Sequence, residues 1–355
     1  MSNISQIDPN FKVESQLKEE GIRFYDVKQP PFRIYGVFYE DGKFRRLPEN
    51  VAKSVSEEVH RLHAKTAGGR VRFRTDSPYV AIQAKMPKIT RTSHCALSGL
   101  AGFDMYTSDG EERYVKTFMP PYDMVDGYEA AITFENPGMH EVTIHFPLYS
   151  EVSELYIGLH KDAFVGEGKT YKPGKPIVYY GSSITQGGCA SRPGNAYESI
   201  ISRRLHVDHI NLGFSGSARA EDEIANYIAH MDMSVFVYDY DHNARTAEYL
   251  QKTHEKMFRI IRDAHPNLPI VMMSMPKYYL TEPEEARRAV IETTYRNALQ
   301  KGDRNVYFLD GKALMAMAGD EGTVDNCHPT DLGFMSMAKT LGDLLAEILK
   351  RIDTL

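Results

Sequence analysis

"PIVYYGSSITQGG", residues 176–188, joins a short apolar run to an abrupt turn. A brief apolar run rich in β-branched and aromatic residues is typical of a buried strand, and this one stops at Gly181. Beyond the turn, strand-like and helix-like segments alternate to the end of the chain. Such alternation predicts an α/β domain with a parallel sheet covered on both faces. Further strands are expected at 209–215, 234–240, 268–276 and 305–311, and helices at 196–205, at 221–231 and from about Thr330 onward.

The part of the chain before residue 165 has a different pattern. Short runs with alternating polarity are separated by turn signals such as "TSDG" (107–110), which predicts an antiparallel, jelly-roll-like β-sandwich. The segment "GEGKTYKPGKP" is rich in Gly, Lys and Pro and is typical of a linker. We therefore predict a sandwich domain over 1–165, a linker over 166–176 and an α/β domain over 177–355.

Composition limits the classes of partner. The formal net charge of the 355 residues is −6 and there is no long basic block, so we expect neither nucleic acid nor a membrane surface as a partner. The start of the chain shows no signal-peptide pattern, and the three cysteines Cys95, Cys189 and Cys327 do not form a disulfide framework. We expect a cytoplasmic protein, with a removed leader as the alternative, and we expect Cys189 and Cys327 to be packed thiols. The sequence leaves an oligomer open.

Two segments together predict nucleophilic chemistry. A serine at the end of a strand is a weak nucleophile that needs a base beside it. In "DNCHPTDLG" (325–333), Asp325 and His328 lie three residues apart in an expected loop. A carboxylate at this spacing can orient the imidazole and leave its other nitrogen free to accept a serine proton. The alternatives are a capping serine and an ordinary surface turn.

Two further segments follow strands and therefore reach the same edge of the sheet. The amide of Gly216 and the side-chain amide of Asn243 could donate hydrogen bonds to an oxyanion. Asp239, Asp241 and His242 could instead suggest a metal, but further ligands at suitable spacing are missing. We therefore predict neither a metal nor an organic cofactor.

The order of these four segments resembles the SGNH (GDSL-type) hydrolase superfamily over residues 174–352. The resemblance implies a flavodoxin-like, three-layer domain with Ser183 as nucleophile, Asp325 as orienting acid and His328 as base. It also implies an oxyanion hole formed by Ser183, Gly216 and Asn243. The sequence departs from the family where Ser182 replaces the usual Asp, and where Asp241 to Ala244 replace Gly-x-Asn-Asp.

A sandwich ahead of such a domain resembles certain bacterial carbohydrate esterases, which implies an acetylesterase that acts on acetylated sugars or oligosaccharides. A lipid or thioester acylhydrolase with the same residues is the first alternative. A non-catalytic carbohydrate-binding protein is the alternative of another class. The residues predicted to line a substrate pocket are Ser182, Gln186, Arg192, Tyr197 and Tyr278.

Overall fold

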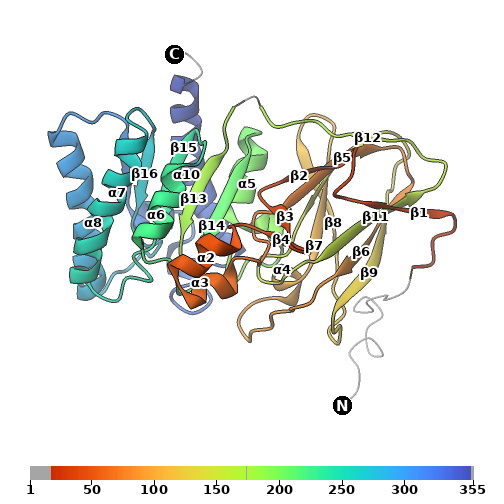
Figure 1. Cartoon of the computed structure of the whole chain (residues 1–355), viewed down its shortest axis with the longest axis horizontal. Helices are drawn as coiled ribbons and strands as arrows, with labels where there is room; N and C mark the ends of the chain where they lie inside the picture. Colours follow the sequence, from red (N-terminus) through yellow and green to blue (C-terminus); the bar gives the residue numbers. More distant parts are fainter. Residues whose placement is uncertain (1–16, 173, 353–355) are drawn as a thin grey trace.

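The N-terminal part of the chain forms two antiparallel sheets packed face to face (Figure 1). The structure is a computed structural model that describes residues 17–172 and 174–352. One sheet has the strand order β1-β11-β6-β9; the other has the order β12-β5-β10-β7-β8, with β2 also paired to β5. The strands are β1 (Ile22–Asp26), β2 (Arg33–Tyr35), β3 (Phe38–Glu40), β4 (Lys43–Arg45), β5 (Arg70–Thr75), β6 (Tyr79–Lys85), β7 (Phe103–Ser108), β8 (Glu112–Phe118), β9 (Gly127–Thr133), β10 (His140–His145), β11 (Glu154–His160) and β12 (Val165–Glu167).

The core of this sandwich follows from the two-residue period of its strands. Val80 and Ile82 of β6 belong to the same buried cluster as Val142 and Ile144 of β10. Since alternate side chains of a strand point to the same face, each sheet directs one apolar row toward the other. The predicted antiparallel sandwich is therefore confirmed. Because β12 pairs with β5, the sandwich continues to Glu167, past the predicted boundary at 165.

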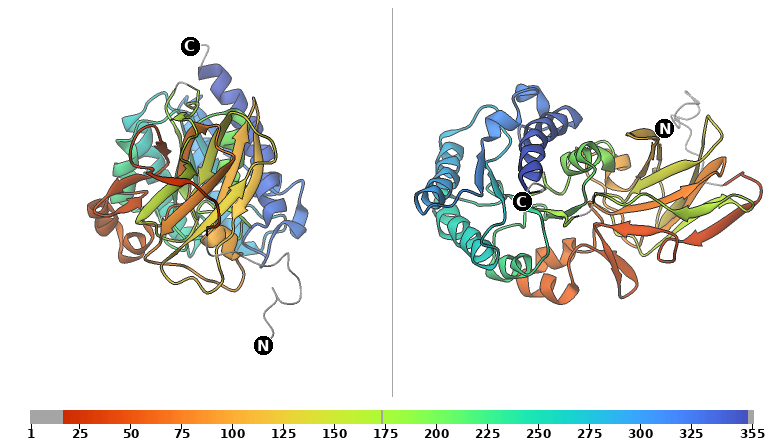
Figure 2. Two further views of the ribbon diagram at one scale, coloured as in Figure 1. Left: turned by 90° about the vertical axis from the view of Figure 1, so that its right-hand side faces the viewer. Right: turned by 90° about the horizontal axis from the view of Figure 1, so that it is seen from above.

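The C-terminal part contains a five-stranded parallel sheet in the order β14-β13-β15-β16-β17. This order, 2-1-3-4-5 along the chain, is that of the flavodoxin-like folds. Seen from above in Figure 2, helices flank the sheet on both sides, so the predicted three-layer α/β fold is confirmed. Its elements are β13 (Ile177–Gly181), β14 (His209–Gly213), β15 (Val235–Asp239), β16 (Ile270–Met273), β17 (Val306–Leu309), α5 (Tyr197–Leu205), α6 (Asp222–Ala229), α7 (Ala247–Ala264), α8 (Glu282–Gln300), α9 (Gly311–Leu314) and α10 (Asp331–Ile352).

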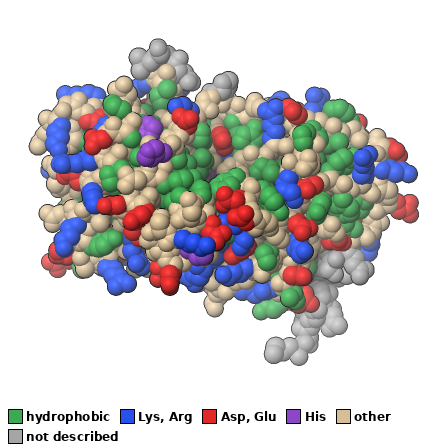
Figure 3. Space-filling model, in the orientation of Figure 1, with side chains coloured by type: hydrophobic (Ala, Val, Ile, Leu, Met, Phe, Trp, Pro, Cys, Tyr) green, Lys and Arg blue, Asp and Glu red, His purple; other side chains and the backbone are tan. Residues whose placement is uncertain are grey.

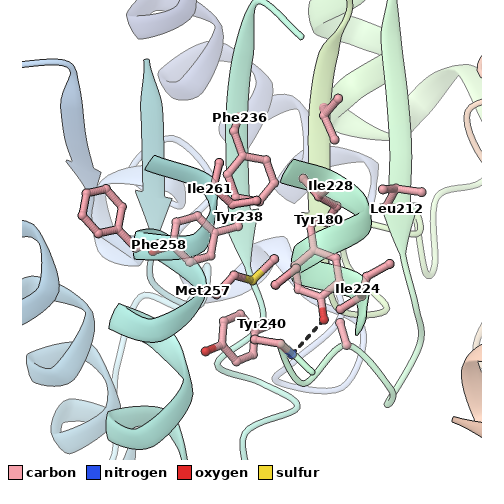
Figure 4. Close-up of a cluster of buried hydrophobic side chains, with 14 of the residues drawn as sticks. Tyr180, Leu212, Ile224, Ile228, Phe236, Tyr238, Tyr240, Met257, Phe258 and Ile261 are labelled. Carbon is pink, nitrogen blue, oxygen red and sulfur yellow. Dashed lines mark hydrogen bonds between the residues drawn. The ribbon is translucent and has the colours of Figure 1, made fainter. Parts of the chain in front are cut away.

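Both faces of this sheet are apolar. Val178 and Tyr180 of β13 belong to the core beneath α6 and α7, which Figure 4 shows in close-up. Ile177 and Tyr179, the alternate residues, belong to the core beneath α5 and α10. A strand buried on both faces is why "PIVYYG" reads as an uninterrupted apolar run.

Two short helices of the N-terminal part join the α/β domain instead of the sandwich. They are α2 (Glu49–Val55) and α3 (Glu57–Leu62). Ala52 and Val59 are buried in the cluster that also contains residues of α6 and β13. These two helices therefore pack on the α/β domain although they precede residue 165, because their apolar side chains complete the core of that domain.

The surface shows no separation of charge by domain in the view of Figure 3, where acidic and basic side chains are interspersed. Within residues 17–172 and 174–352, no helix is long and apolar enough to cross a membrane.

Candidate active site

Ser183 follows a strand end at which only glycine fits. A Cβ on Gly181 would lie 2.2 Å from Thr185 Oγ1 and 2.4 Å from the carbonyl oxygen of Asp239. Without a side chain, the chain can turn sharply here and carry Ser183 to the carboxyl edge of the sheet. The Ser183 side chain is packed closely, and the residue is 8% exposed. This edge is where ligands bind in open α/β sheets.

His328 and Asp325 reach this edge from the loop before α10. The Oγ of Ser183 lies 2.9 Å from Nε2 of His328, and Nδ1 of the same ring lies 2.8 Å from Oδ2 of Asp325. The amide of His328 also donates to Oδ1 of Asp325 at 2.7 Å. Burial alone would raise the pKa of Asp325, but these hydrogen bonds outweigh it and hold the pKa below its usual value. The carboxylate therefore stays ionised and fixes the ring.

The two candidate oxyanion segments lie beside the serine. The amide of Phe214 donates to the Gly181 carbonyl at 2.8 Å, and Nδ2 of Asn243 donates to the Phe214 carbonyl at 3.3 Å. Gly216 has a φ of 70°, a left-handed conformation that favours glycine. Within residues 17–172 and 174–352, the amides of Ser183 and Gly216 have no hydrogen-bond acceptor. Both are therefore available to a ligand.

Ser182 stands where the resembling family carries an aspartate, and it points into the protein. It is fully buried, its hydroxyl accepts from the Ile184 amide at 3.2 Å, and its amide donates to the Asp239 carbonyl at 3.1 Å. The carboxyl of Asp239 lies behind the same turn, 3.4 Å from Thr185 Oγ1. Burial, then the neighbouring Asp241, raises the pKa of Asp239 well above its usual range. A buried carboxyl group therefore still supports the turn, but it comes from Asp239 at the end of β15 and not from residue 182.

Gln186 and Tyr197, like Ser182, are buried. The fully buried amide of Gln186 donates to the Leu148 carbonyl at 3.2 Å and accepts from the Ser215 amide at 3.0 Å. The Tyr197 hydroxyl lies in the core, 3.3 Å from Thr185 Oγ1. The burial of these three residues argues against their predicted pocket role. Closeness to Ser183 along the chain does not tell which side chains of a turn face outward.

Arg192 and Tyr278 are partly exposed and have partners of their own. Arg192 Nη1 donates to Asp104 Oδ2 of the sandwich at 2.8 Å. Lys312 Nζ lies 5.1 Å from the centre of the Tyr278 ring. Neither contact reaches Ser183, so the pocket role of these two residues stays a prediction.

The sandwich domain supplies side chains that the sequence did not reveal. The buried hydroxyl of Tyr149 donates to the carbonyl oxygen of Ser183 at 3.1 Å. The His94 ring lies 5.5 Å from the His328 ring between centroids. No periodicity or spacing marks these residues, because they come from loops whose ends meet the other domain only in the folded protein.

Two groups of possible metal ligands include His328. His94, Cys189 and His328 form one, and Asp325, Cys327 and His328 form the other; within each group the ligand atoms lie within 4.8 Å of one another. A metal bound to Nε2 of His328 would take the base away from Ser183, since a metal-bound imidazole nitrogen cannot accept a proton. The expectation of a metal-free site stays a prediction.

Comparisons with known proteins identify both domains. The model of the GDSL-like lipase/acylhydrolase family matches residues 174–346, and the model of the N-terminus of SGNH-hydrolase-type esterases matches residues 22–165. No curated protein sequence matches the chain. The crystal structure of a protein from Bacteroides ovatus, described as a GDSL-like lipase, is 27% identical with a TM-score of 0.84. That likeness covers 93% of this chain and 98% of the other.

More distant structures share the two-domain fold. A salicylyl acyltransferase from a tetracycline biosynthetic pathway is 20% identical, with a TM-score of 0.73, over 93% of this chain and 98% of the other. An acetyl xylan esterase from Butyrivibrio proteoclasticus is 12% identical, with a TM-score of 0.61, over 93% and 99%. With both of its domains matched by family models and its strands in the flavodoxin-like order, the chain belongs to the SGNH (GDSL-type) hydrolases and is a carboxylic ester hydrolase with an N-terminal β-sandwich.

Proposed function

We propose that this protein is a serine acetylesterase that removes acetyl groups from acetylated carbohydrates through an acyl-enzyme. The observation that carries the proposal is the continuous hydrogen-bonded chain from Ser183 Oγ to His328 Nε2, at 2.9 Å, and from His328 Nδ1 to Asp325 Oδ2, at 2.8 Å. A nucleophile, a base and a group that orients the base are thereby in contact.

The reaction takes two half-steps. His328 Nε2 accepts the proton of Ser183 Oγ while that oxygen attacks the ester carbonyl. The tetrahedral intermediate collapses, the sugar hydroxyl leaves with the proton from His328, and the acetyl group stays on Ser183. Water, deprotonated by His328, then releases acetate. Asp325 keeps the Nδ1 proton in place and stabilises the imidazolium in both steps.

The oxyanion of each intermediate is bound by three donors. These are the unpaired amides of Ser183 and Gly216 and the side-chain amide of Asn243. The left-handed backbone of Gly216 and the Asn243–Phe214 hydrogen bond hold the last two donors at the strand ends. Loss of one such donor reduces turnover by about 10² to 10³.

The surroundings favour a short acyl group on a polar alcohol. An apolar cavity of about 640 Å³ exists, but it lies at the opposite edge of the sheet, next to the starts of β15 and β16, and cannot hold an acyl chain bonded to Ser183. A cavity of about 350 Å³ beside Cys95 is lined by Arg91, Thr92 and Ser93 together with the apolar side chains of Leu97 and Leu100 and the ring of Tyr122. Hydroxyl and guanidinium groups suit a hydroxylated substrate better than a lipid chain.

The comparisons support the carbohydrate part of the proposal. The same two-domain arrangement occurs in family two carbohydrate esterases from Clostridium thermocellum and Cellvibrio japonicus, and in the acetyl xylan esterase already named. Their identities to this chain are 12%, so they support the arrangement and not a particular sugar.

The test compares two adjacent serines. Ser183→Ala should abolish hydrolysis of p-nitrophenyl acetate and labelling by a fluorophosphonate, whereas Ser182→Ala, which loses one buried hydrogen bond, should retain most activity. A fully active Ser183→Ala variant would refute the nucleophile. If the wild type neither turned over the acetate nor took up the label, the non-catalytic sugar-binding alternative would replace the proposal.

A second series tests the substrate class. Acetate release from acetylated xylo-oligosaccharides is expected, and kcat/KM for p-nitrophenyl esters should fall from acetate to butyrate to octanoate. A preference for octanoate would favour the lipid acylhydrolase alternative and exclude the deacetylase.

A further inference from the structure

Two cysteines from different domains meet beside the active site, and the proposed esterase reaction uses neither. Cys95 lies in the loop between β6 and α4 (Leu97–Leu100) of the sandwich, and Cys189 lies in the turn that follows Ser183. Their Sγ atoms are 3.3 Å apart, and both thiols are free. The third cysteine has a different neighbour: Cys327 Sγ lies 3.6 Å from His242 Nδ1.

Close packing and a hydrogen bond hold these two loops together. A Cβ on Gly99 would lie 2.0 Å from the carbonyl oxygen of Ala190, so only glycine allows the loops to approach this closely. Ser98 Oγ donates to the Ser191 carbonyl at 2.6 Å. The residues next to each cysteine are therefore held together, and the two sulfurs face each other across the domain junction.

The turn that carries Cys189 also packs directly against the catalytic residues. Cys189 has a φ of 72°, and the preceding Gly188 packs so tightly that a Cβ there would lie 2.9 Å from the Ser183 carbonyl oxygen and 3.3 Å from His328 Cδ2. A non-glycine residue in the left-handed region is strained and kept in place by its neighbours. Movement of Cys189 would therefore reach Ser183 and His328.

The chemistry of the pair is that of an activated thiol. The hydrogen bond from Cys189 lowers the pKa of Cys95, burial opposes this, and Thr92 and His94 lower the pKa further. The pKa of Cys189 is raised, first by its hydrogen bond to Cys95 and then by burial. Cys95 is the more exposed of the two cysteines and is therefore the one that an oxidant reaches first, and the thiolate is the form that reacts with it. It borders the cavity of about 350 Å³, through which a small oxidant can enter.

We propose that Cys95 and Cys189 form an oxidative modification site, at which a hydroperoxide creates a reversible disulfide between the two domains. The Cys95 thiolate attacks hydrogen peroxide, breaks the O–O bond and becomes a sulfenic acid with release of hydroxide. The Cys189 thiol then attacks this sulfur, its proton leaves with the hydroxyl as water, and the S–S bond forms. Two thiols are oxidised and one peroxide is reduced; a dithiol reverses the step.

The bond should slow the esterase. Closing the sulfurs from 3.3 Å to the disulfide length of about 2.05 Å moves Cys189 and the attached turn relative to His328. Displacements of this size near reacting groups cost up to about 10² in rate. We therefore expect a fall of about tenfold or more in kcat/KM, restored by dithiothreitol.

The experiment counts thiols and so does not depend on esterase activity. Wild type, Cys95→Ser, Cys189→Ser and Cys327→Ser are treated with equimolar hydrogen peroxide in EDTA, which keeps metal-bound cysteines from being scored as oxidised. The wild type should fall from three free thiols to one, and Cys327→Ser from two to none. Both other variants should keep their two thiols free of a disulfide. Peptide mapping should give a Cys95–Cys189 cross-link with loss of two hydrogens.

Three results would overturn the site: retention of all three thiols, a cross-link that contains Cys327, or a disulfide between two molecules on a non-reducing gel. Because the linked residues are 94 positions apart, the intramolecular bond should also raise the Tm of the wild type but not of Cys189→Ser. If the disulfide forms and kcat/KM is unchanged, the modification site stands and its role as a switch is refuted.

Discussion

The cores of the two domains and the junction between them differ in how many charged groups they bury. Each core is apolar, with residues such as Ile82 in the sandwich and Val178 in the α/β domain. The junction also contains apolar residues such as Leu148, but it adds arginines: Arg46 and Arg70 are almost fully buried, and Arg192 reaches across from the active-site turn. Apolar cores tolerate repacking, whereas a planar guanidinium accepts only partners at fixed positions. The junction therefore fixes the relative placement of the domains.

Arg46 is the clearest case. Its Nε donates to the Lys65 carbonyl at 2.6 Å, Nη2 to the Leu62 carbonyl at 3.1 Å, and Nη1 to the carbonyls of Asn211 and Gly213 at 3.1 and 2.7 Å. Burial lowers the pKa of Arg46 to about 9, so it remains charged at neutral pH. One side chain thus ties the α3 segment to the end of β14.

The residues of the active site also come from both domains. Ser183, His328 and Asp325 all come from the α/β domain and form the reactive chain. Tyr149 and His94 come from the sandwich and lie against it. If the two sets differ in this way, substitutions of Ser183, His328 or Asp325 should lower kcat. Substitutions in the junction should first lower the free energy of unfolding or shift the catalytic residues.

The largest effect is expected inside the α/β domain. Asp325→Asn keeps the shape of the side chain but removes the charge that orients the His328 ring. By the known behaviour of such triads, kcat should fall by about 10³ to 10⁴. Steady-state kinetics with p-nitrophenyl acetate measures this, and urea unfolding should show little change because the Asp325 side chain is 40% exposed. A fall below tenfold would remove Asp325 from the proposed mechanism.

The next effect tests the junction. Arg46→Met leaves several buried carbonyl oxygens without their donor, and each such group costs about 1–3 kcal/mol. We expect a loss of at least about 3 kcal/mol in the free energy of unfolding, measured with urea. Leu212→Ala is the control in the apolar core, where the cost is about 2–5 kcal/mol.

Arg46→Lys separates charge from geometry, because lysine restores the positive charge without the several N–H donors of the planar guanidinium. If geometry governs the junction, lysine should recover little of the lost stability. Full recovery would mean that charge alone holds the domains, and the contrast with the cores would fail.

Much of this architecture could be predicted from the sequence. The parts that could not be predicted all depend on contacts between the two domains. The run 176–181 and the segments after it have the periodicity of a buried parallel sheet, and strand ends meet at one edge. That rule places Ser183 at this edge, but Asp325 and His328 lie beyond β17 and α9, and only the resemblance to the SGNH hydrolases implied their place beside it. The α2–α3 segment carries an apolar face but no mark of which core it joins. The partner of Cys189 likewise depends on a loop of the other domain.

A smaller effect is expected at Asp104, which ties the sandwich to the active-site turn. Its carboxylate accepts from Arg192 Nη1 at 2.8 Å, from the Gly194 amide at 2.9 Å and contacts His145 Nδ1 at 3.0 Å. Asp104→Asn weakens hydrogen bonds to a charged group, at a cost of about 2 kcal/mol at neutral pH. Urea unfolding at pH 7 measures this.

The pH dependence of that variant gives an independent check. Burial would raise the pKa of Asp104, but His145 and Arg192 outweigh burial and lower it. A lowered folded-state pKa contributes stability that is present above the unfolded value, near 3.8, and is lost as pH falls through the folded value. Below about pH 4, the wild type should therefore lose stability more steeply than Asp104→Asn. Parallel curves would contradict the assignment.

The smallest effect should come from Tyr149, the sandwich residue whose hydroxyl touches the nucleophile's backbone. Tyr149→Phe removes one hydrogen bond, about 1 kcal/mol, to the Ser183 carbonyl. If the sandwich positions the serine, kcat should fall about fivefold with KM and stability nearly unchanged. Burial raises the pKa of Tyr149, so its hydroxyl stays neutral and the loss should be the same at pH 6 and pH 9. Loss of stability without loss of kcat would instead make Tyr149 part of the junction, and the sandwich would then shape the site only through its arginines.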